Sequence, residues 1–176
     1  MQERRAVVAP LRSGEGTPPV RSRRGWALIL GVAAAVVVVD QLTKTWALHH
    51  LRDGPRHVVW TLRFNLTFNT GIAFSQASGS TAVVTVIALV VVALLLVIAR
   101  RTGGALTGVV LGLVIGGAVG NLLDRLVRHH GGAVIDFIDL QWWPVFNVAD
   151  AAITIGVVIA LVRAVLGPSR GRAEAA

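Results

Sequence analysis

The 176-residue chain contains no cysteine, one lysine and only nine acidic residues. Without cysteine the protein has no disulfide, no thiolate nucleophile and no thiolate metal site. The zinc-protease motif HExxH is also missing, which excludes the helical pair of histidines that binds zinc in such enzymes. We therefore expect neither a metal nor a cofactor. The groups left for chemistry are the carboxylates, the hydroxyls and the single lysine, Lys44.

Charged residues make up 15% of the sequence, whereas hydrophobic residues make up 54%. A transmembrane helix needs about 20 mostly apolar residues. Four runs approach or reach this length, at residues 26–46, 81–99, 105–123 and 150–166. In water this surface would aggregate, which argues against a soluble core. We predict an all-α membrane protein with four transmembrane helices in one domain, residues 26–167.

The net charge of +8 is distributed as in a membrane protein rather than in a nucleic-acid-binding one. With both termini in the cytoplasm, eleven basic residues fall inside and six outside, in line with the positive-inside rule. Residues 1–25, rich in Arg, Pro, Gly and Ser, then form a disordered cytoplasmic tail, and residues 168–176 form a second tail. The loops 50–80 and 126–149 lie outside, and all six aspartates lie on or near the outer face.

The outer segment 50–80 is too polar to span the membrane. Between Val58 and Phe68, apolar and aromatic residues alternate largely with polar ones, which predicts a strand with one apolar face. Gly71, two residues after Asn69, predicts a turn that bends the chain back. Because an open sheet edge cannot lie in hydrocarbon, we expect a small extracytoplasmic β element at the outer membrane surface.

Five of the nine acidic residues lie at or beside the ends of apolar segments, and they are Asp40, Asp124, Asp136, Asp139 and Asp150. A carboxylate near hydrocarbon is costly and is therefore functional by default. Asp136 and Asp150 flank the last part of the outer loop 126–149, so their side chains can meet at the outer end of the bundle. If their carboxyls meet, they share one proton as in aspartic proteases, where one carboxylate takes a proton from water and the other acid protonates the substrate. The spacing alone is also compatible with a different function, a pathway for protons or cations.

Helical spacing orients several of these side chains. Asp40 and Lys44 are four residues apart, acid before base, which favours an ion pair at a helix end. Asn147 is a candidate N-cap for the last helix, whose first turn holds Asp150. A stripe of glycines lets another helix pack closely and directs Asp124, the next residue on the stripe, into the bundle; its members are Gly108, Gly112, Gly116 and Gly120.

Two other hypotheses for the charged residues belong to different functional classes. A serine–lysine protease would use Lys44 as base and Ser75, Ser78 or Ser80 as nucleophile. These serines lie in a polar turn, and Lys44 already has Asp40 as a partner. A proton-coupled transporter also uses intramembrane acids, but here they gather at one face instead of forming a chain across the bilayer.

Five motifs follow one another along the chain: DQLTK at 40–44, NTGIAFS at 69–75, GNLLDR at 120–125, VIDF at 134–137 and FNVAD at 146–150. Together they resemble the lipoprotein signal peptidase (signal peptidase II) family. The resemblance implies an intramembrane aspartyl endopeptidase of the bacterial cytoplasmic (inner) membrane, with its active site near the extracytoplasmic face. Its partners would be membrane lipid and prolipoproteins bearing a diacylglyceryl-cysteine, cleaved before that cysteine. We expect a monomer and no nucleic-acid partner.

The resemblance places the catalytic pair on Asp136 and Asp150. It gives substrate-binding or supporting roles to further residues, namely Asp40, Lys44, Asn69, Gly71, Asn121, Asp124, Arg125 and Asn147. For the catalytic role we favour Asp136 over Asp124, because Asp124 beside Arg125 is better suited to a structural ion pair.

The chain departs from the family pattern in two places. Ile72 stands where an alanine is usual, which narrows the expected substrate groove. The segment 126–133 is longer than in many members, and it bears on the choice between Asp124 and Asp136.

The charge distribution predicts which side of the membrane each loop faces. A cysteine introduced by Ser78→Cys should react with a membrane-impermeant thiol reagent in intact cells, because the 50–80 loop lies outside. A cysteine introduced by Thr102→Cys should not react. Labelling is read as a mass shift of the otherwise cysteine-free protein. The reverse pattern would invert the topology and place the acids in the wrong compartment.

Overall fold

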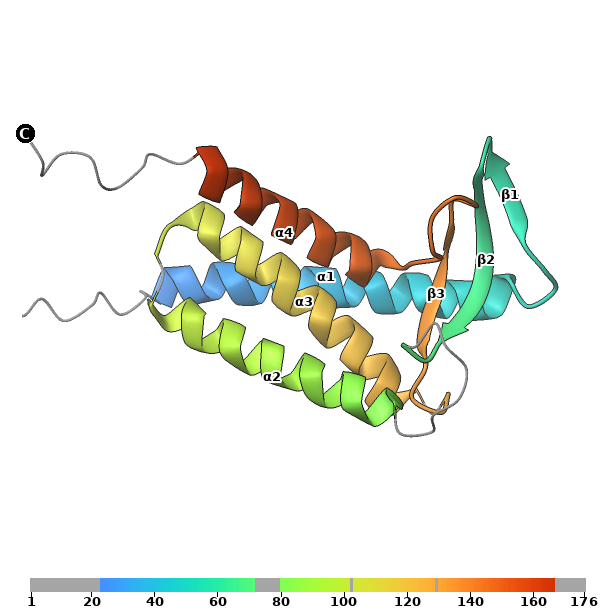
Figure 1. Cartoon of the computed structure of the whole chain (residues 1–176), viewed down its shortest axis with the longest axis horizontal. Helices are drawn as coiled ribbons and strands as arrows, with labels where there is room; N and C mark the ends of the chain where they lie inside the picture. Colours follow the sequence, from blue (N-terminus) through green and yellow to red (C-terminus); the bar gives the residue numbers. More distant parts are fainter. Residues whose placement is uncertain (1–22, 72–79, 102, 129, 167–176) are drawn as a thin grey trace, which may run out of the picture.

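The computed structural model describes residues 23–71, 80–101, 103–128 and 130–166. Its four long helices are α1 (Arg23–His50), α2 (Ser80–Arg101), α3 (Ala105–Val127) and α4 (Val148–Leu166). They form a bundle with a small sheet across one end (Figure 1). The predicted fold class and number of spans are confirmed. The predicted tails fall largely outside the described residues, although residues 23–25, assigned to the first tail, open α1.

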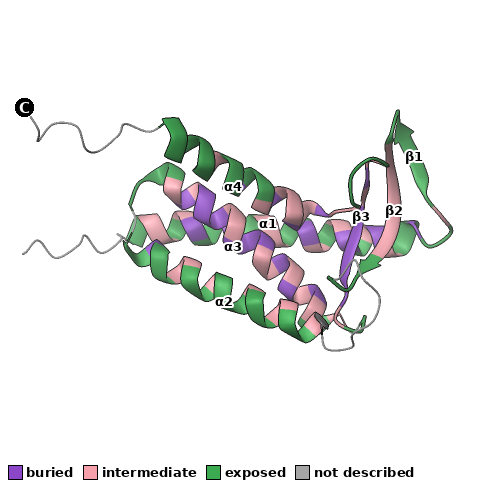
Figure 2. Cartoon of the chain, in the orientation of Figure 1, coloured by how far each residue is buried: buried purple, intermediate pink, exposed green. Residues whose placement is uncertain are grey.

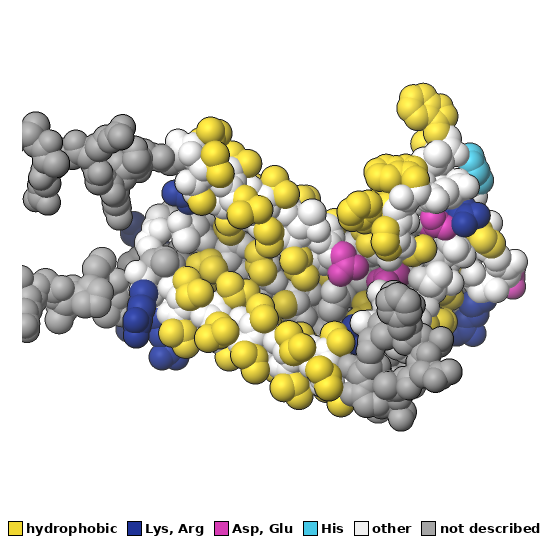
Figure 3. Space-filling view, in the orientation of Figure 1, with side chains coloured by type: hydrophobic (Ala, Val, Ile, Leu, Met, Phe, Trp, Pro, Cys, Tyr) yellow, Lys and Arg dark blue, Asp and Glu magenta, His cyan; other side chains and the backbone are white. Residues whose placement is uncertain are grey.

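All four helices are long and apolar enough to cross a membrane. The outward faces of α2 and α4 carry mostly exposed Val, Leu and Ile side chains (Figure 2, Figure 3). α3 packs against each of the other helices and holds many of the buried positions of the bundle. A helix bundle that covers its outside with apolar side chains is suited to lipid rather than to water.

Glycines on α3 set its distance from α1. A Cβ added at Gly112 would lie 2.7 Å from Cβ of Val32, and one added at Gly116 would lie 2.8 Å from the carbonyl oxygen of Ala33. At Gly120 the nearest atom to an added Cβ, at 2.7 Å, is a carboxylate oxygen of Asp40. The stripe predicted from the sequence therefore brings α1 and α3 together backbone to backbone, and its last step lies against a buried acid.

The sheet consists of β1 (Arg56–Val59), β2 (Leu62–Asn69) and β3 (Val134–Asp139), antiparallel and in that order. The prediction of a single strand over Val58–Phe68 is wrong, because a two-residue turn at Trp60 and Thr61 divides this segment between the two strands of a hairpin. Trp60 has a positive φ of 50°, and the ring Nε2 of His57 lies 2.7 Å from its carbonyl oxygen. The alternation of apolar and polar residues continues through this turn, so the sequence pattern does not indicate it.

β3 was predicted only as part of an outer loop. It is a buried strand, with Ile135 opposite Phe68 and Val134 opposite Asn69. Side chains on both of its faces are buried, so its short apolar run lacks the alternation that marks a half-buried strand. This pairing brings Asn69 beside Asp136.

An aromatic cluster fixes the sheet to the end of α1. The ring of Trp46 lies 5.3 Å from that of Phe64 on β2 and 6.4 Å from that of Phe137 on β3, both edge to face. Ala47 and Leu51 are buried beneath the same cluster. Such aromatic pairs add to the stabilisation from buried area, so the C-terminal end of α1 and the sheet form one packed unit.

The glycine stripe provides a test of the fold. Gly116→Ala should lower the free energy of unfolding by about 1–3 kcal/mol, because the added methyl group overpacks the contact with α1. Gly31→Ala is the matched control, since no atom lies within 4 Å of a Cβ at that helical position. Thermal unfolding of the detergent-solubilised variants measures both. Equal stability of the two variants would contradict the close α1–α3 contact.

Candidate active site

A buried lysine lies between two buried carboxylates near the end of the bundle that carries the sheet. The Lys44 Nζ lies 2.8 Å from an oxygen of Asp40 on its own helix and 2.8 Å from an oxygen of Asp124 on α3, and all three side chains are 0% exposed. Its third hydrogen bond, 3.0 Å long, goes to the amide oxygen of Asn121. The ammonium has three donors and therefore three acceptors, which a buried cation requires.

The ion pair predicted between Asp40 and Lys44 is present. It is fully buried, because the stripe ending at Gly120 brings α3 over it. Asp124 does lie in the bundle interior as predicted. The expected ion pair between Asp124 and Arg125 is wrong: Asp124 pairs with Lys44 and, at 3.4 Å, with Arg128. Residues adjacent along a helix do not face each other, whereas residues four apart do.

The two carboxylates around Lys44 also hold the backbone next to two further aspartates. Asp40 accepts a 2.9 Å hydrogen bond from the backbone N–H of Ala149, which precedes Asp150. Asp124 accepts one of 3.1 Å from the N–H of Ile135, which precedes Asp136. The position of each backbone segment is therefore tied to the buried charges.

Asp136, on β3, is 1% exposed. One of its oxygens accepts a 2.7 Å hydrogen bond from the amide of Asn147, and the other accepts a 2.9 Å bond from the amide of Asn69. Burial, together with the negative charge of Asp150, raises the pKa of Asp136 to about 6, although the two amide donors and Lys44 oppose the rise. A carboxyl with this pKa is suited to exchange a proton in the weakly acidic to neutral range.

Asp150 lies in the first turn of α4 and shares a reciprocal cap with Asn147. The Asn147 amide oxygen accepts from the Asp150 N–H at 2.9 Å, and an Asp150 oxygen accepts from the Asn147 N–H at 3.3 Å. The predicted N-cap is thus confirmed. The other Asp150 oxygen accepts a 2.8 Å bond from the amide of Asn121.

Two asparagines join these parts into one network. Asn147 bonds both Asp136 and Asp150, and its amide also donates to Asn121 at 3.1 Å. Asn121 in turn accepts from Lys44 and donates to Asp150. The structure therefore brings together a pair of aspartates, two bridging amides and a buried charge cluster at the end of the bundle that carries the sheet.

Three more of the predicted residues lie together beside Asp136. The Gly71 N–H donates to the Asn69 side-chain oxygen at 2.8 Å, with a positive φ of 88° at Gly71. The guanidinium of Arg125 donates to the carbonyl of Gly132 at 3.1 Å. A Cβ on Gly71 would lie 3.1 Å from Arg125, so a side chain there would press on the guanidinium.

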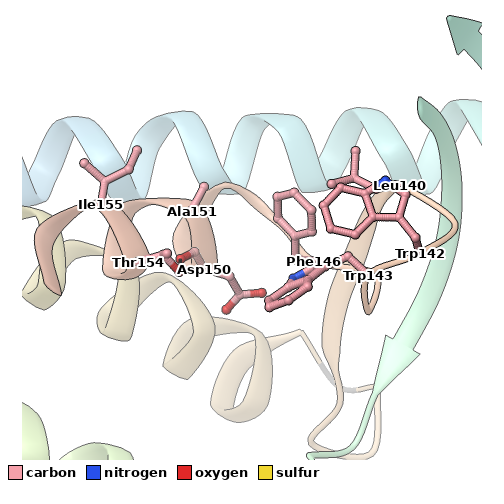
Figure 4. Close-up of a pocket in the computed structure, with 8 residues that line it drawn as sticks. All are labelled: Leu140, Trp142, Trp143, Phe146, Asp150, Ala151, Thr154 and Ile155. Atoms are coloured by element: carbon pink, nitrogen blue, oxygen red, sulfur yellow. Dashed lines mark hydrogen bonds between the residues drawn. The ribbon is translucent and has the colours of Figure 1, made fainter. Parts of the chain in front are cut away.

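A pocket of about 410 Å³ opens beside Asp150. It lies between α4 and the loop that follows β3, and Figure 4 shows Asp150 between the helical residues Thr154 and Ile155 and the rings of Trp143 and Phe146. Acidic side chains are visible in the hollow between the apolar bundle and the sheet in Figure 3. The pocket is mainly apolar and open, with one carboxylate in its lining.

Comparisons with known proteins show the family of the chain. The family model described as signal peptidase (SPase) II matches residues 32–166. A lipoprotein signal peptidase of Mycobacterium avium is 40% identical over 160 residues, 88% of each chain. One of Mycobacterium leprae is 36% identical over 92% of this chain and 82% of its own. The chain belongs to the signal peptidase II family.

Solved structures support the same relationship. A bacterial membrane enzyme determined by the in meso method at 1.9 Å resolution superposes with a TM-score of 0.72 and 27% identity, over 80% of this chain and 94% of that one. A second such structure, at 2.3 Å resolution, gives 0.69. The four-helix bundle with its small sheet is thus the fold of this signal peptidase II family member.

Other acidic and nucleophilic groups lie outside this arrangement. Asp139 forms a 2.7 Å salt bridge with Arg63 across β2 and β3. Burial favours its protonated form, but hydrogen bonds from Arg63, Gln141 and Asn65 outweigh that effect and lower its pKa. We assign it to sheet stability. Of the serines considered as nucleophiles, Ser75 and Ser78 lie outside the described residues, as does Ile72.

Two members of the charge cluster were not predicted from the sequence. Gln41 donates to Asp124 at 3.1 Å, and Arg128 lies 3.4 Å from the same carboxylate. The spacing of Arg128, four residues after Asp124, was a usable signal. No sequence pattern indicated Gln41, because its role depends on how α1 and α3 pack.

The buried cluster predicts the cost of removing its lysine. Lys44→Met should lower the free energy of unfolding by about 3–5 kcal/mol, since it leaves two buried carboxylates without their counter-ion. Arg52→Met removes a nearby exposed cation and should have little effect. Thermal unfolding of the purified variants measures both. A Lys44→Met protein as stable as the wild type would contradict the assigned role of the ion pair.

Proposed function

We propose that this member of the signal peptidase II family removes the signal peptide from prolipoproteins and uses Asp136 and Asp150 as its catalytic pair. The observation that carries the proposal is that one residue, Asn147, bonds both aspartates, and that only one of the two lies on a buried strand. Two carboxyls in different environments are the arrangement that general acid–base hydrolysis requires.

In the proposed reaction Asp136 starts with the shared proton and Asp150 starts ionised. Asp150 takes a proton from water while the oxygen of that water attacks the scissile carbonyl carbon, and Asp136 gives its proton to the carbonyl oxygen. Asp150 then protonates the amide nitrogen as the carbon–nitrogen bond breaks, and Asp136 recovers a proton from the diol intermediate. The pair returns to its starting state, as general acid–base catalysis demands.

The proposed substrate is a prolipoprotein whose cysteine carries a diacylglyceryl group. The apolar pocket beside Asp150 and the exposed Trp142 and Trp143 lie where lipid chains and headgroups would meet the protein. Each buried methylene contributes roughly 0.8 kcal/mol to membrane anchoring, so two acyl chains hold the substrate in the bilayer. Asn69 and Arg125 then orient the peptide backbone beside the catalytic pair.

We place the enzyme as a monomer in the bacterial cytoplasmic membrane, with both termini inside and the catalytic pair near the outer face. The distribution of charge supports this orientation. The end of the bundle opposite the sheet carries the arginines at the start of α1 and at the end of α2, whereas the sheet end carries the aspartates (Figure 1).

The catalytic assignment is tested by isosteric replacement. Asp136→Asn and Asp150→Asn keep side-chain size but remove the acid and base, so each should lower kcat by at least about 100-fold on a diacylglyceryl-modified precursor. Asp53→Asn is the control, because Asp53 is an exposed aspartate of the same outer region. Substantial turnover by either dyad variant, in correctly inserted protein, would refute the assignment.

The environment of Asp136 predicts the pH dependence. The competent pair holds one proton, so kcat/KM should fall as the pH rises through about 6, where Asp136 ionises. Asn69→Ala removes a hydrogen bond that favours the ionised form of Asp136, so the pKa of Asp136 should rise. The descending limb of the pH profile of kcat/KM should then move to higher pH.

Asn65→Ala is the matched control for that measurement. Asn65 lies on the same strand but donates to Asp139 instead of Asp136, at 3.3 Å. Its substitution should leave the position of the limb unchanged. A limb that moves equally in both variants, or moves down in Asn69→Ala, would contradict the assigned hydrogen bond.

A further inference from the structure

Arg128 reaches from the end of α3 to α1. It is the C-cap residue of α3, and its side chain is 18% exposed. The guanidinium donates to the side-chain oxygen of Gln41 at 3.0 Å, to the backbone carbonyl of Gln41 at 2.9 Å and to the hydroxyl of Thr45 at 2.9 Å. These three bonds to one turn of α1 fix the direction of the arginine.

Gln41 connects Arg128 to the two buried carboxylates. Its amide nitrogen lies within 3.2 Å of Asp40, 3.1 Å of Asp124 and 3.1 Å of the carbonyl of Gly120. The amide can donate in this direction only while its oxygen faces the other way, toward Arg128. The arginine therefore selects the orientation of the glutamine that serves both carboxylates.

Arg128 also completes the charge balance. Asp40 and Asp124 bring two negative charges, and Lys44 brings one positive charge. The guanidinium, 3.4 Å from Asp124, supplies the second positive charge at the edge of the cluster. Without it the cluster carries an uncompensated negative charge in a region of low dielectric constant, where such charges act strongly.

We propose that Arg128 and Gln41 form a latch that positions the catalytic pair, through the two carboxylates that hold the backbone before Asp136 and Asp150. The latch orients Asp124 and Asp40, and these accept from the N–H groups of Ile135 and Ala149. Both latch residues lie away from the pocket beside Asp150, so they act as positioning residues. The inference rests on the proposed function of the pair.

Loss of the latch has an electrostatic consequence at Asp136. That carboxyl is faced by Asp150 from α4, by Lys44 from α1 and by Arg125 from α3. Asp124 contacts both Lys44 and the N–H of Ile135, the residue before Asp136. Removing the guanidinium leaves Asp124 less neutralised, so the added negative potential favours the protonated form of Asp136. A loss of packing alone would not produce this change.

The first experiment compares Arg128→Met, Arg128→Lys and the control Arg52→Met on a diacylglyceryl-modified precursor. Arg128→Met should lower kcat roughly 10-fold with little change in KM, less than the 100-fold that a 1 Å misplacement costs. Arg128→Lys restores the charge and should recover part of the loss, while Arg52→Met should match the wild type. Wild-type kcat in Arg128→Met, or no recovery in Arg128→Lys, would overturn the latch.

A second measurement separates the latch from the proposed function, because it needs no substrate. Infrared titration of the free protein labelled with 13C-aspartate follows the carboxyl band that Asp136→Asn removes. In Arg128→Met its midpoint should move to higher pH, and in Arg52→Met it should stay. An unmoved midpoint together with a lowered unfolding temperature would reduce Arg128 to a stabilising role, whether or not the wild type cleaves the precursor.

The latch also predicts coupling between its two members. Gln41→Leu should lower kcat at least as much as Arg128→Met, and the double variant should be no worse than Gln41→Leu alone, because both act through one contact. Additive losses would overturn the proposal.

Discussion

The structure depends on the burial of one ammonium group between two carboxylates from different helices. Lys44 is the only lysine of the chain, and it is fully buried with Asp40 and Asp124. Breaking such a pair by removal of one partner is far more costly than its net contribution suggests. The arrangement therefore demands that α1 and α3 meet in one register, and the small residues of α3 permit the close approach that this register needs.

From this cluster the geometry of the site follows outward. Each carboxylate accepts from a backbone N–H that precedes one of the two proposed catalytic aspartates, while Asn121 and Asn147 connect the lysine to both aspartates. The members of the pair nevertheless differ. Asp136 lies on a buried strand and accepts from two amides, whereas Asp150 caps a helix and borders an apolar pocket. This asymmetry is what separates the acid from the base in the proposed reaction.

Much of the fold could be predicted from run lengths and helical periods, because a membrane helix needs little more than twenty apolar residues. The glycine stripe correctly placed Asp124 inside the bundle. The hairpin was missed because its turn at Trp60 has neither Gly nor Asn, and β3 was missed because burial on both sides removes its alternation. The partners of Asp124 and the role of Gln41 depend on the register of α1 against α3, which no local pattern of the sequence records.

On this view the protein cuts a lipid-modified precursor with the pair of aspartates that the network holds. The most direct test is mass spectrometry of the products formed by the purified, full-length protein from a diacylglyceryl-modified precursor, with the unmodified precursor beside it. We expect one cut, immediately before the modified cysteine, and an intact unmodified precursor. Equal cleavage of both precursors would contradict lipid positioning, and no cleavage of the modified one would contradict the proposed function itself.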